Sequence, residues 1–215
     1  MLGMMDDVWT AKVKDFLLPL RHFEWGANMN NCDYSDKAYG TAVSQVGLYA
    51  AMDRLGIAQI ISRVGLLLDD NSGESLDQAK LDWMESDLWQ PVRKMVEDSF
   101  VTKDWFELCI AQNFAMDGVV YPLFYDHFQK AGMAHGGAAM VMLNEFMQDW
   151  FKDEVRWVDQ LVKVTAAESS ENSNLLSKWM GDWTDCAVAA FTPLAHHVLG
   201  SEAEEAMQAI RADLT

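Results

Sequence analysis

Four long stretches of this sequence repeat apolar residues at alternating spacings of three and four, and this pattern constrains the fold more than any other feature. Such spacing places the apolar side chains on one face of an α-helix. Strict alternation of apolar and polar residues, the pattern of a half-buried strand, is nearly absent, and the 215 residues include only four prolines. The pattern predicts an all-α protein built around a large four-helix bundle.

The helix boundaries follow from turn-forming residues between the periodic stretches. Residues 69–73 and 169–173 are polar clusters typical of connections, and Ser86 with Asp87 is typical of a helix start. A chain of this length can bury one substantial core, so we expect a single domain over residues 1–215. The expected core helices, within about 10–165, and accessory helices, within about 170–215, cover residues 10–31, 38–68, 74–84, 87–99, 102–131, 136–165, 170–181, 183–199 and a short stretch from 201.

Charge and cysteine content exclude several classes of protein. Charged residues interrupt every apolar stretch, so no segment offers the roughly 20 apolar residues of a membrane-spanning helix. The N-terminal sequence lacks the features of a signal peptide, and we expect a cytoplasmic protein. A formal net charge of −17 repels nucleic acid and anionic lipid, which makes a basic protein surface the better partner. Cys32, Cys109 and Cys186 form no paired motif and are expected to be reduced thiols in the core.

Three acidic residues fall on or beside the expected apolar faces of long helices. Glu154 is in line with Trp150 and Trp157, Asp53 lies in the middle of the second long helix, and Glu24 adjoins the apolar side of the first. An unpaired carboxylate in a protein interior is costly, so each needs a cation, a proton or a metal. The alternative is that these acids lie at the edges of their helix faces, where they reach solvent or pair with arginine.

The spacing of the histidines argues against a di-iron site built from this chain alone. In helical di-iron proteins, two pairs of Glu followed three residues later by His combine with a Glu from each of two other helices. No acid precedes a histidine by three residues here, and Trp157 stands at that spacing after Glu154. Adjacent helical residues diverge by about 100 degrees, so His196 and His197 cannot face one metal. The five histidines are His22, His127, His135, His196 and His197.

Five runs of the sequence closely resemble the β subunit of the hydroxylase in bacterial phenol hydroxylases, which are multicomponent di-iron monooxygenases. The runs are LPLRHFEWGANMNN (18–31), YAAMDRLGIAQIISRVGLLLD (49–69), SLDQAKLDWMES (75–86), VEDSFVTKDWFELCIAQN (96–113) and NEFMQDWFKDEVRWVDQ (144–160). The resemblance implies a ferritin-like helical bundle with additional C-terminal helices. It also implies that the chain lacks the N-terminal region that usually precedes the first bundle helix in this family.

The resemblance also implies which residues occupy former ligand positions. In α-type chains of the family, the run similar to residues 153–157 ends in Asp-Glu-x-Arg-His. Glu154 therefore keeps the acid of that pair, and Trp157 replaces the histidine. The other Glu-x-x-His pair is represented by Asp53 and Gly56. Neither tryptophan nor glycine can bind iron through its side chain, so both pairs are incomplete.

A di-iron site also takes one glutamate from each of two other helices, and these two acids are retained less completely. Glu24 stands where the first helix of α-type chains supplies its glutamate, and Met116 or Asp117 is the nearest candidate for the other. We therefore expect no metal ligand, no cofactor ligand and no catalytic residue in this chain. Glu24, Asp53 and Glu154 are expected instead to approach one another inside the bundle. Hydrogen bonds or arginines would hold them, and the candidate arginines are Arg54, Arg63 and Arg156.

The function implied by the resemblance is that of a non-catalytic β subunit in a dimer of α, β and γ protomers. The α subunit would carry the di-iron centre and hydroxylate phenol or a related ring with dioxygen and electrons derived from NADH. The three separated cysteines cannot ligate an iron–sulfur cluster that needs four. A standalone ferritin-like oxidase or metal-binding protein is the alternative. An interaction protein that no longer joins a hydroxylase is a third possibility.

The helices within about 10–68 carry more apolar residues than one inward face can hold. Such a surplus predicts a large interface with an α-type subunit or a second copy of the chain. An obligate interface of this kind buries on the order of 2,000 Å² or more. The surplus residues are Leu17, Leu18, Phe23, Trp25 and Met29 on the first helix and Tyr39, Tyr49, Met52 and Leu66 on the second.

Overall fold

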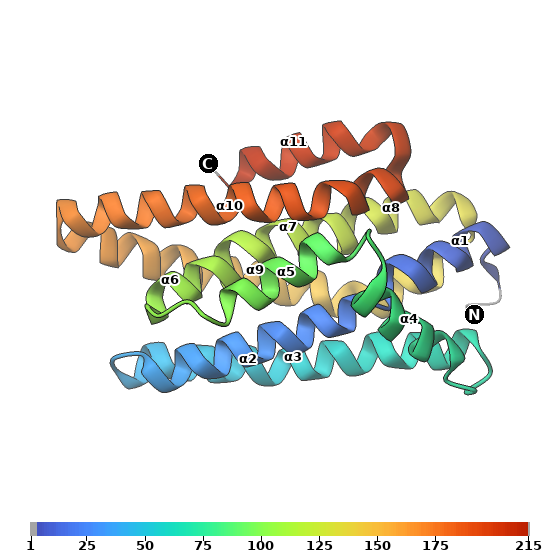
Figure 1. Ribbon diagram of the computed structural model, residues 1–215, viewed down its shortest axis with the longest axis horizontal. Helices are drawn as coiled ribbons and strands as arrows, with labels where there is room; N and C mark the ends of the chain where they lie inside the picture. Colours follow the sequence, from blue (N-terminus) through green and yellow to red (C-terminus); the bar gives the residue numbers. More distant parts are fainter. Residues whose placement is uncertain (1–3, 215) are drawn as a thin grey trace.

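The computed structural model describes residues 4–214, and in that range every regular element is a helix (Figure 1). Two long antiparallel pairs frame the molecule. α2 (Leu20–Lys37) and α3 (Thr41–Leu68) lie side by side as one layer, and α9 (Ala138–Glu168) turns directly into α10 (Ser170–Leu199). The prediction of an all-α helical bundle is confirmed.

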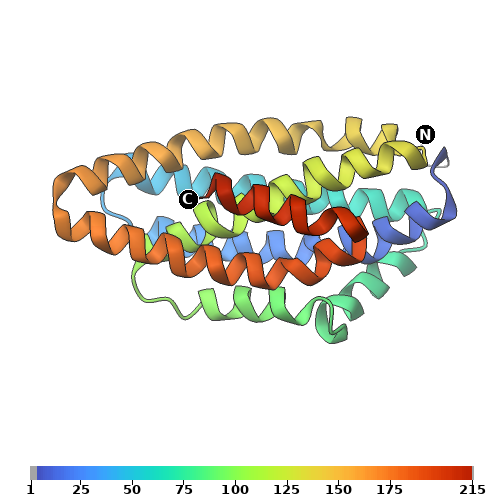
Figure 2. The same ribbon diagram turned by 90° about the horizontal axis from the view of Figure 1, so that it is seen from above.

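A continuous central helix passes between these pairs. It consists of the elements α6 (Trp105–Cys109), η3 (Ile110–Met116), α7 (Asp117–Pro122), η4 (Leu123–His127) and α8 (Phe128–Gly132). Asp104 caps its first turn by accepting hydrogen bonds from the amides of Phe106 and Glu107. α2 lies on one side of this helix, α10 on the opposite side and α9 along a third (Figures 1 and 2). Because it has neighbours all round, the helix can be apolar all round, and nearly every residue from Leu108 to Tyr125 is buried.

Shorter elements close the ends and the remaining side of the bundle. α11 packs on α10 and α7, and α5 contacts α2 and α10. The C-terminal helices expected after residue 170 are present as α10 and α11. These shorter elements are α1 (Asp7–Lys12), η2 (Val13–Leu17), α4 (Glu74–Glu85), α5 (Gln90–Ser99), η5 (Met133–His135), η6 (Gly200–Glu202) and α11 (Ala203–Asp213).

The inner face of α3 is rotated by one residue relative to the expected face. We expected Asp53 to point inward, whereas Arg54 is fully buried and Asp53 is only half-buried. The cause is the close packing of α3 on α2, which places small residues at the contact. A Cβ atom added to Gly47 would lie 2.4 Å from the ring of Tyr34 on α2. The buried residues of α3 are Gly47, Ala50, Ala51, Arg54, Ile57, Ile61, Val64 and Gly65.

Three expected helix boundaries are wrong, two of them because tertiary packing outweighs local sequence preference. α10 continues through Gly181, where we expected a break, although glycine costs a helix up to about 1 kcal/mol. Contacts with α5, α9, α11 and the central helix stabilise α10 along its length. α2 extends beyond residue 31 to Lys37, since Tyr34 is buried, stacks on Trp105 and donates a hydrogen bond to the carbonyl of Val43 at 2.7 Å. The expected helix 10–31 is also divided near Pro19, which precedes α2.

Only one of the three cysteines lies in the core. Cys109 is buried, but Cys32 and Cys186 are exposed, so the prediction of three core thiols is wrong for two of them. Both exposed cysteines lie on the outer faces of α2 and α10, where the 3.6-residue repeat turns them away from the bundle. Across residues 4–214, no helix is both long enough and apolar enough to cross a membrane.

Candidate functional site

A cluster of charged side chains is buried at the centre of the bundle around Arg54. Nη1 of Arg54 donates to Glu24 Oε2 at 3.2 Å, and Nη2 donates to Asp117 and, at 3.3 Å, to both carboxylate oxygens of Glu154. Tyr121 Oη accepts a hydrogen bond from Nη1 at 2.8 Å and lies 3.4 Å from Glu24 Oε1, to which it donates. The guanidinium thus connects α2, α3, α7 and α9, and we call these five residues the Arg54 cluster.

Two aromatic rings enclose the guanidinium. Its Cζ atom lies 4.5 Å from the ring centroid of Trp150 and 5.3 Å from that of Tyr121, so both rings make cation–π contacts with it. Trp150 Nε1 donates to Asp53 Oδ2 at 2.9 Å. The prediction that Asp53 joins Glu24 and Glu154 is therefore wrong, since Asp53 instead orients the Trp150 ring that covers the guanidinium.

Uncharged polar side chains extend the cluster across the central helix. Gln112 Nε2 donates to Asp117 Oδ1 at 3.0 Å, and Asn30 Nδ2 donates to Gln112 Oε1 at 2.9 Å and to Ser99 Oγ at 2.8 Å. Gln112 and Asp117 are five residues apart, and the wide turn of η3, a π-helix, brings them to the same side. A continuous chain of buried hydrogen bonds therefore connects α5 to α3.

The electrostatics of the cluster favour protonated acids. Burial raises the pKa of Glu24 to about 7, although the nearby guanidinium opposes this shift. Burial also raises the pKa values of Asp117 and Glu154, again against the opposing effect of Arg54. One guanidinium balances only one carboxylate. Asp117, which accepts hydrogen bonds from both Arg54 and Gln112, is the acid best placed to stay ionised.

This donor set does not fit a di-iron centre. The three carboxylates already have a cation between them, and the cluster contains no histidine. Within residues 4–214, no three His, Cys, Asp or Glu side chains form a group that could hold a metal ion. The cluster also lacks access to solvent, since all five members are buried. What it can do chemically is to hold four helices together through directional, charge-assisted hydrogen bonds.

The structure separates the other predicted positions from the cluster. Met116 is buried in the apolar core, and Gly56 is half-buried on α3. Trp157 is also half-buried and packs against a small apolar cluster that contains Tyr34 and Cys109. Their separation from Arg54 follows from helix phase, because Arg54 and Asp117, rather than Asp53 and Met116, turn toward the centre.

Of the three candidate arginines, only Arg54 holds the acids. Arg63 is exposed, and Arg156 is exposed and pairs with Asp153 at 2.7 Å. Glu24 and Glu154 approach the same point in the bundle, as predicted. Sequence reasoning assigned no role to Gln112 or Asn30. The signal for Gln112 is its position directly after the apolar residues 108–111, whereas Asn30 lies beside Asn28 and Asn31 and gives no such signal.

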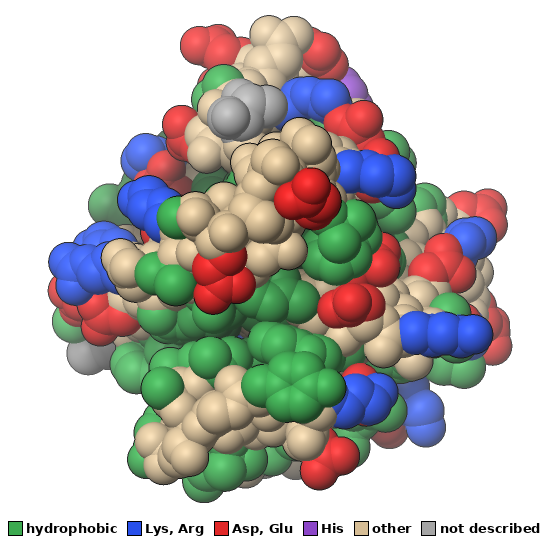
Figure 3. Space-filling model, turned by 90° about the vertical axis from the view of Figure 1, so that its left-hand side faces the viewer, with side chains coloured by type: hydrophobic (Ala, Val, Ile, Leu, Met, Phe, Trp, Pro, Cys, Tyr) green, Lys and Arg blue, Asp and Glu red, His purple; other side chains and the backbone are tan. Residues whose placement is uncertain are grey.

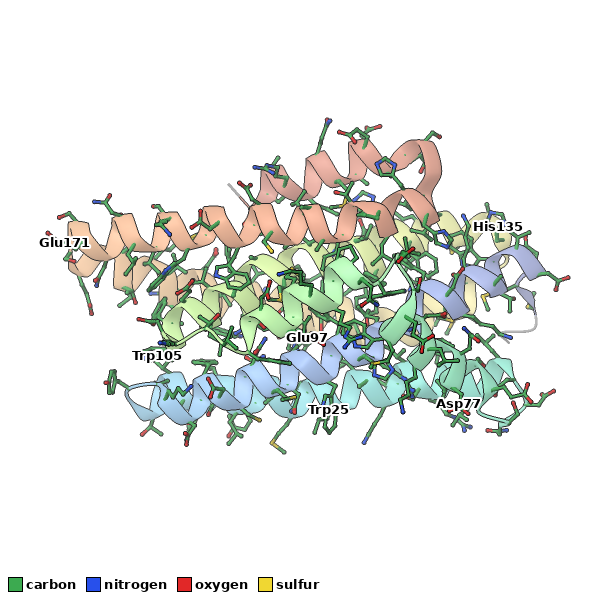
Figure 4. All side chains as sticks on the ribbon, viewed as in Figure 1. Trp25, Asp77, Glu97, Trp105, His135 and Glu171 are labelled. Atoms are coloured by element: carbon green, nitrogen blue, oxygen red, sulfur yellow. The ribbon has the colours of Figure 1, made fainter. Side chains whose placement is uncertain are left out.

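A second unusual region is the outer face of α2 and α3. Trp25 is 57% exposed and Tyr49 and Met52 are each 63% exposed, and Trp25 points away from the rest of the bundle (Figure 4). Hydrophobic side chains also gather at the end of the bundle where these helices meet (Figure 3). The prediction of surplus apolar surface is wrong for Leu17, Leu18 and Phe23, which are fully buried in the core, where Phe23 lies edge-on to Phe191 of α10. Leu66 is half-buried, whereas Met29 and Tyr39 are exposed as expected.

Comparisons with known proteins find similar sequences along most of the chain. Residues 1–169 match the family model for Methane/Phenol/Alkene Hydroxylase. The chain is 46% identical over 190 residues to the protein described as phenol 2-monooxygenase, oxygenase component DmpL, of Pseudomonas sp. (strain CF600). That match covers 88% of this chain and 57% of the relative. The chain is also 44% identical over 201 residues to oxygenase component MhpL of Acinetobacter pittii (strain PHEA-2), covering 93% and 60%. The chain thus spans less than two thirds of the length of these relatives.

Solved structures show the same arrangement of helices. Phenol hydroxylase from Pseudomonas sp. OX1, studied under xenon pressure, superposes with a TM-score of 0.93 and 42% sequence identity. That match covers 98% of this chain and 63% of the other. A toluene 4-monooxygenase structure superposes with a TM-score of 0.81 at 17% identity and shows similarity of fold alone.

Proposed function

This chain belongs to the methane/phenol/alkene hydroxylase family, and on that premise we propose that it is the non-catalytic, β-type subunit of a multicomponent aromatic monooxygenase hydroxylase. The observation that carries the proposal is the buried guanidinium of Arg54 between the carboxylates of Glu24, Asp117 and Glu154. A fixed cation at this point supplies the positive charge that buried carboxylates require. Binding a metal there would first require displacing a side chain that is covalently part of α3.

The proposed role of the chain is to support a catalytic partner. An α-type subunit would hold the di-iron centre and place one oxygen atom of dioxygen on phenol or a related ring, using electrons derived from NADH. A γ-type subunit would complete the protomer, and two protomers would form the cytoplasmic complex. This chain would contribute a rigid bundle, held by the Arg54 cluster, and the apolar outer face of α2 and α3 for association.

The proposal is tested by purifying the chain alone and together with co-expressed α-type and γ-type subunits. Elemental analysis should find iron only in samples that contain the α-type subunit, and only those samples, with a reductase, should hydroxylate phenol. The assembled sample should contain equal amounts of the three chains by mass spectrometry. Two irons bound per copy of the isolated chain at neutral pH, or turnover of phenol by that chain alone, would contradict the proposal.

A further inference from the structure

A groove of about 510 Å³ lies between α2 and α3 on the outer side of this pair, and we call it the α2–α3 groove. Its walls are formed by Arg21, His22 and Trp25 from α2 and by Leu55, Ala58 and Ser62 from α3. The pair lies at the edge of the molecule in Figure 1, and Trp25 projects from it away from the bundle (Figure 4). The proposed function assigns this face to association but names no chemistry for the surface that it binds.

The two helices place no exposed acidic side chain along this groove, although the chain is strongly acidic. Of the 33 acidic residues in the sequence, residues 20–32 and the whole of α3 contain only Glu24 and Asp53. Glu24 is buried in the Arg54 cluster, and Asp53 is half-buried and accepts a hydrogen bond from a ring of α9. The cations that reach solvent in the same two segments are Arg21 and Arg63. This face is therefore neutral to positive, whereas the chain as a whole carries a net charge of −17.

The guanidinium of Arg21 is held at one end of the groove without forming a salt bridge within residues 4–214. Its Nε donates to His22 Nε2 at 3.3 Å, and its Nη2 donates to the carbonyl of Leu76 on α4 at 3.0 Å. Burial lowers the pKa of Arg21, and the charge of Asp77 on α4 opposes this effect from beyond salt-bridge distance. Burial also lowers the pKa of His22 to about 4, so this neighbour is neutral at pH 7. A half-buried cation fixed in this way is suited to pair with an incoming carboxylate.

The groove continues into a row of exposed apolar side chains on α3, which gives the surface the length of a helix. Leu48 is 48% exposed, and Tyr49 and Met52 are each 63% exposed. From Tyr49 to Arg63, α3 rises by about 21 Å, which corresponds to about four turns. Because α2 and α3 are antiparallel, Arg21 and Arg63 lie at the same end of this surface. An amphipathic helix of about 14 residues, with an apolar stripe and an acid near one end, matches its length, polarity and charge.

We propose that the α2–α3 groove binds an amphipathic helix of the α-type subunit, whose apolar side packs on Trp25 and Leu55 and whose acidic residue pairs with Arg21. This inference rests on the proposed function and adds the chemistry of the partner surface. The net charge of the chain predicted a basic partner, whereas the local charges of this face favour an acidic one. A second copy of the chain fits less well, because a symmetric contact would place two acid-free faces against each other.

The test measures the affinity of the full chain for the α-type subunit by biolayer interferometry, with the γ-type subunit present. Arg21→Glu should weaken binding at least tenfold, and Arg21→Lys, which keeps the charge, should stay within about threefold of the unchanged chain. Arg211→Glu, an exposed replacement on α11 at the opposite edge of the molecule, is the matched control and should change nothing (Figure 1). Arg21 is half-buried and its replacement could unfold the chain, so the exposed Arg63→Glu provides a second variant, which should weaken binding about threefold.

A photoreactive side chain identifies the occupant of the groove directly. Gln59, an exposed residue that lines the groove, is replaced by p-benzoylphenylalanine in the assembled complex, and the labelled peptide is identified by mass spectrometry. We expect a helical segment of the α-type subunit that contains an acid, and changing this acid to lysine should restore binding by Arg21→Glu. Labelling of a second copy of this chain or of a segment without an acid overturns this inference alone, as does unchanged binding by folded Arg21→Glu and Arg63→Glu. Failure of the unchanged chain to bind an α-type subunit contradicts the proposed function as well.

Discussion

The centre of the bundle and the outer face of α2 and α3 have the opposite of the usual distribution of side chains. Arg54 and three acids are buried, whereas Trp25, Tyr49 and Met52 are exposed. Tyr49 and Arg54 lie on the same helix, five residues apart, so α3 connects both regions. The charged groups of the centre have their partners within the chain, while the three apolar side chains of the outer face stay more than half exposed within residues 4–214. Polarity alone therefore does not identify a site of interaction; the presence or absence of partners does.

The largest effect is expected from breaking the charge balance of the centre. Arg54→Met leaves three buried acids without a cation and should lower the free energy of unfolding by about 3–5 kcal/mol, measured by urea denaturation. Arg63→Met, on the exposed side of the same helix, is the control and should stay within about 0.5 kcal/mol of the unchanged chain. Equal losses in the two variants would show that the Arg54 cluster does not stabilise the fold.

The next effect concerns the pH dependence of stability. The pKa of Glu24 is about 7 in the folded chain and 4.5 ordinarily, so the folded state binds a proton more tightly than the unfolded state. The associated stabilisation is present below about pH 4.5 and is lost as pH rises through about 7. Over these 2.5 units, at about 1.4 kcal/mol per unit, the loss is about 3.5 kcal/mol.

Glu24→Gln should remove this part of the pH dependence, because glutamine cannot titrate. The measurement is urea denaturation at several values between pH 4.5 and 8, and the slope of stability against pH should be less negative in the variant. Glu145→Gln, an exposed replacement on α9, is the control. Parallel curves for Glu24→Gln and the unchanged chain would contradict the assignment of a raised pKa to Glu24.

A smaller effect on stability, but a clear one on association, is expected at the outer face. Trp25→Glu and Tyr49→Asp should leave the free energy of unfolding within about 1 kcal/mol, since neither side chain is buried in the isolated chain. Light scattering should show less self-association, and binding to an α-type subunit should weaken at least tenfold. Val101→Asp, at an exposed apolar position between α5 and α6, controls for added charge. If that variant weakens binding as much, the partner surface lies elsewhere.

The smallest effect should come from the junction of the two regions, where Asp53 orients Trp150. Trp150→Phe keeps a ring over the guanidinium but loses the hydrogen bond from Nε1, which should cost about 1 kcal/mol of stability. Asp53→Asn retains an acceptor oxygen and should cost less. A loss in Trp150→Phe as large as that in Arg54→Met would mean that the ring, rather than the ion pairs, holds the cluster.

Particular helices explain how far sequence reasoning succeeded. The long apolar repeats predicted an all-α bundle because a 3.6-residue period leaves few alternatives. Glu24 and Glu154 were placed correctly because each sits within or beside a stripe of large apolar residues. The predicted inner face of α3 was off by one residue because four of its eight buried residues are glycine or alanine, which a search for large apolar side chains overlooks. The division into one domain over residues 1–215 stays a prediction.

Asp117 was predicted only as an alternative to Met116, for a different physical reason. Assigning residues to helix faces from sequence assumes the α-helical rotation of about 100 degrees per residue. The turns of η3, directly before Asp117, are wider than that. Met116 and Asp117 were both plausible under an ordinary period, and only the folded helix shows which one faces Arg54. The surface that binds a partner is equally hard to predict from sequence, because contact with a second chain produces no periodic pattern of its own.

The two π-helical turns of the central helix, η3 and η4, also affect how its relatives should be aligned. Each wide turn holds an additional residue, so removing a single residue inside η3 would let the backbone close into ordinary α-turns. The segments on either side would keep nearly the same relative orientation, because the wide turn spreads one additional residue over about the rotation of an α-turn. Two homologous chains that differ by such a gap would present equivalent positions to the bundle centre, although the number of residues between those positions differs by one. Inherited ligand positions on this helix must therefore be assigned by superposing backbones, not by counting residues from a shared motif.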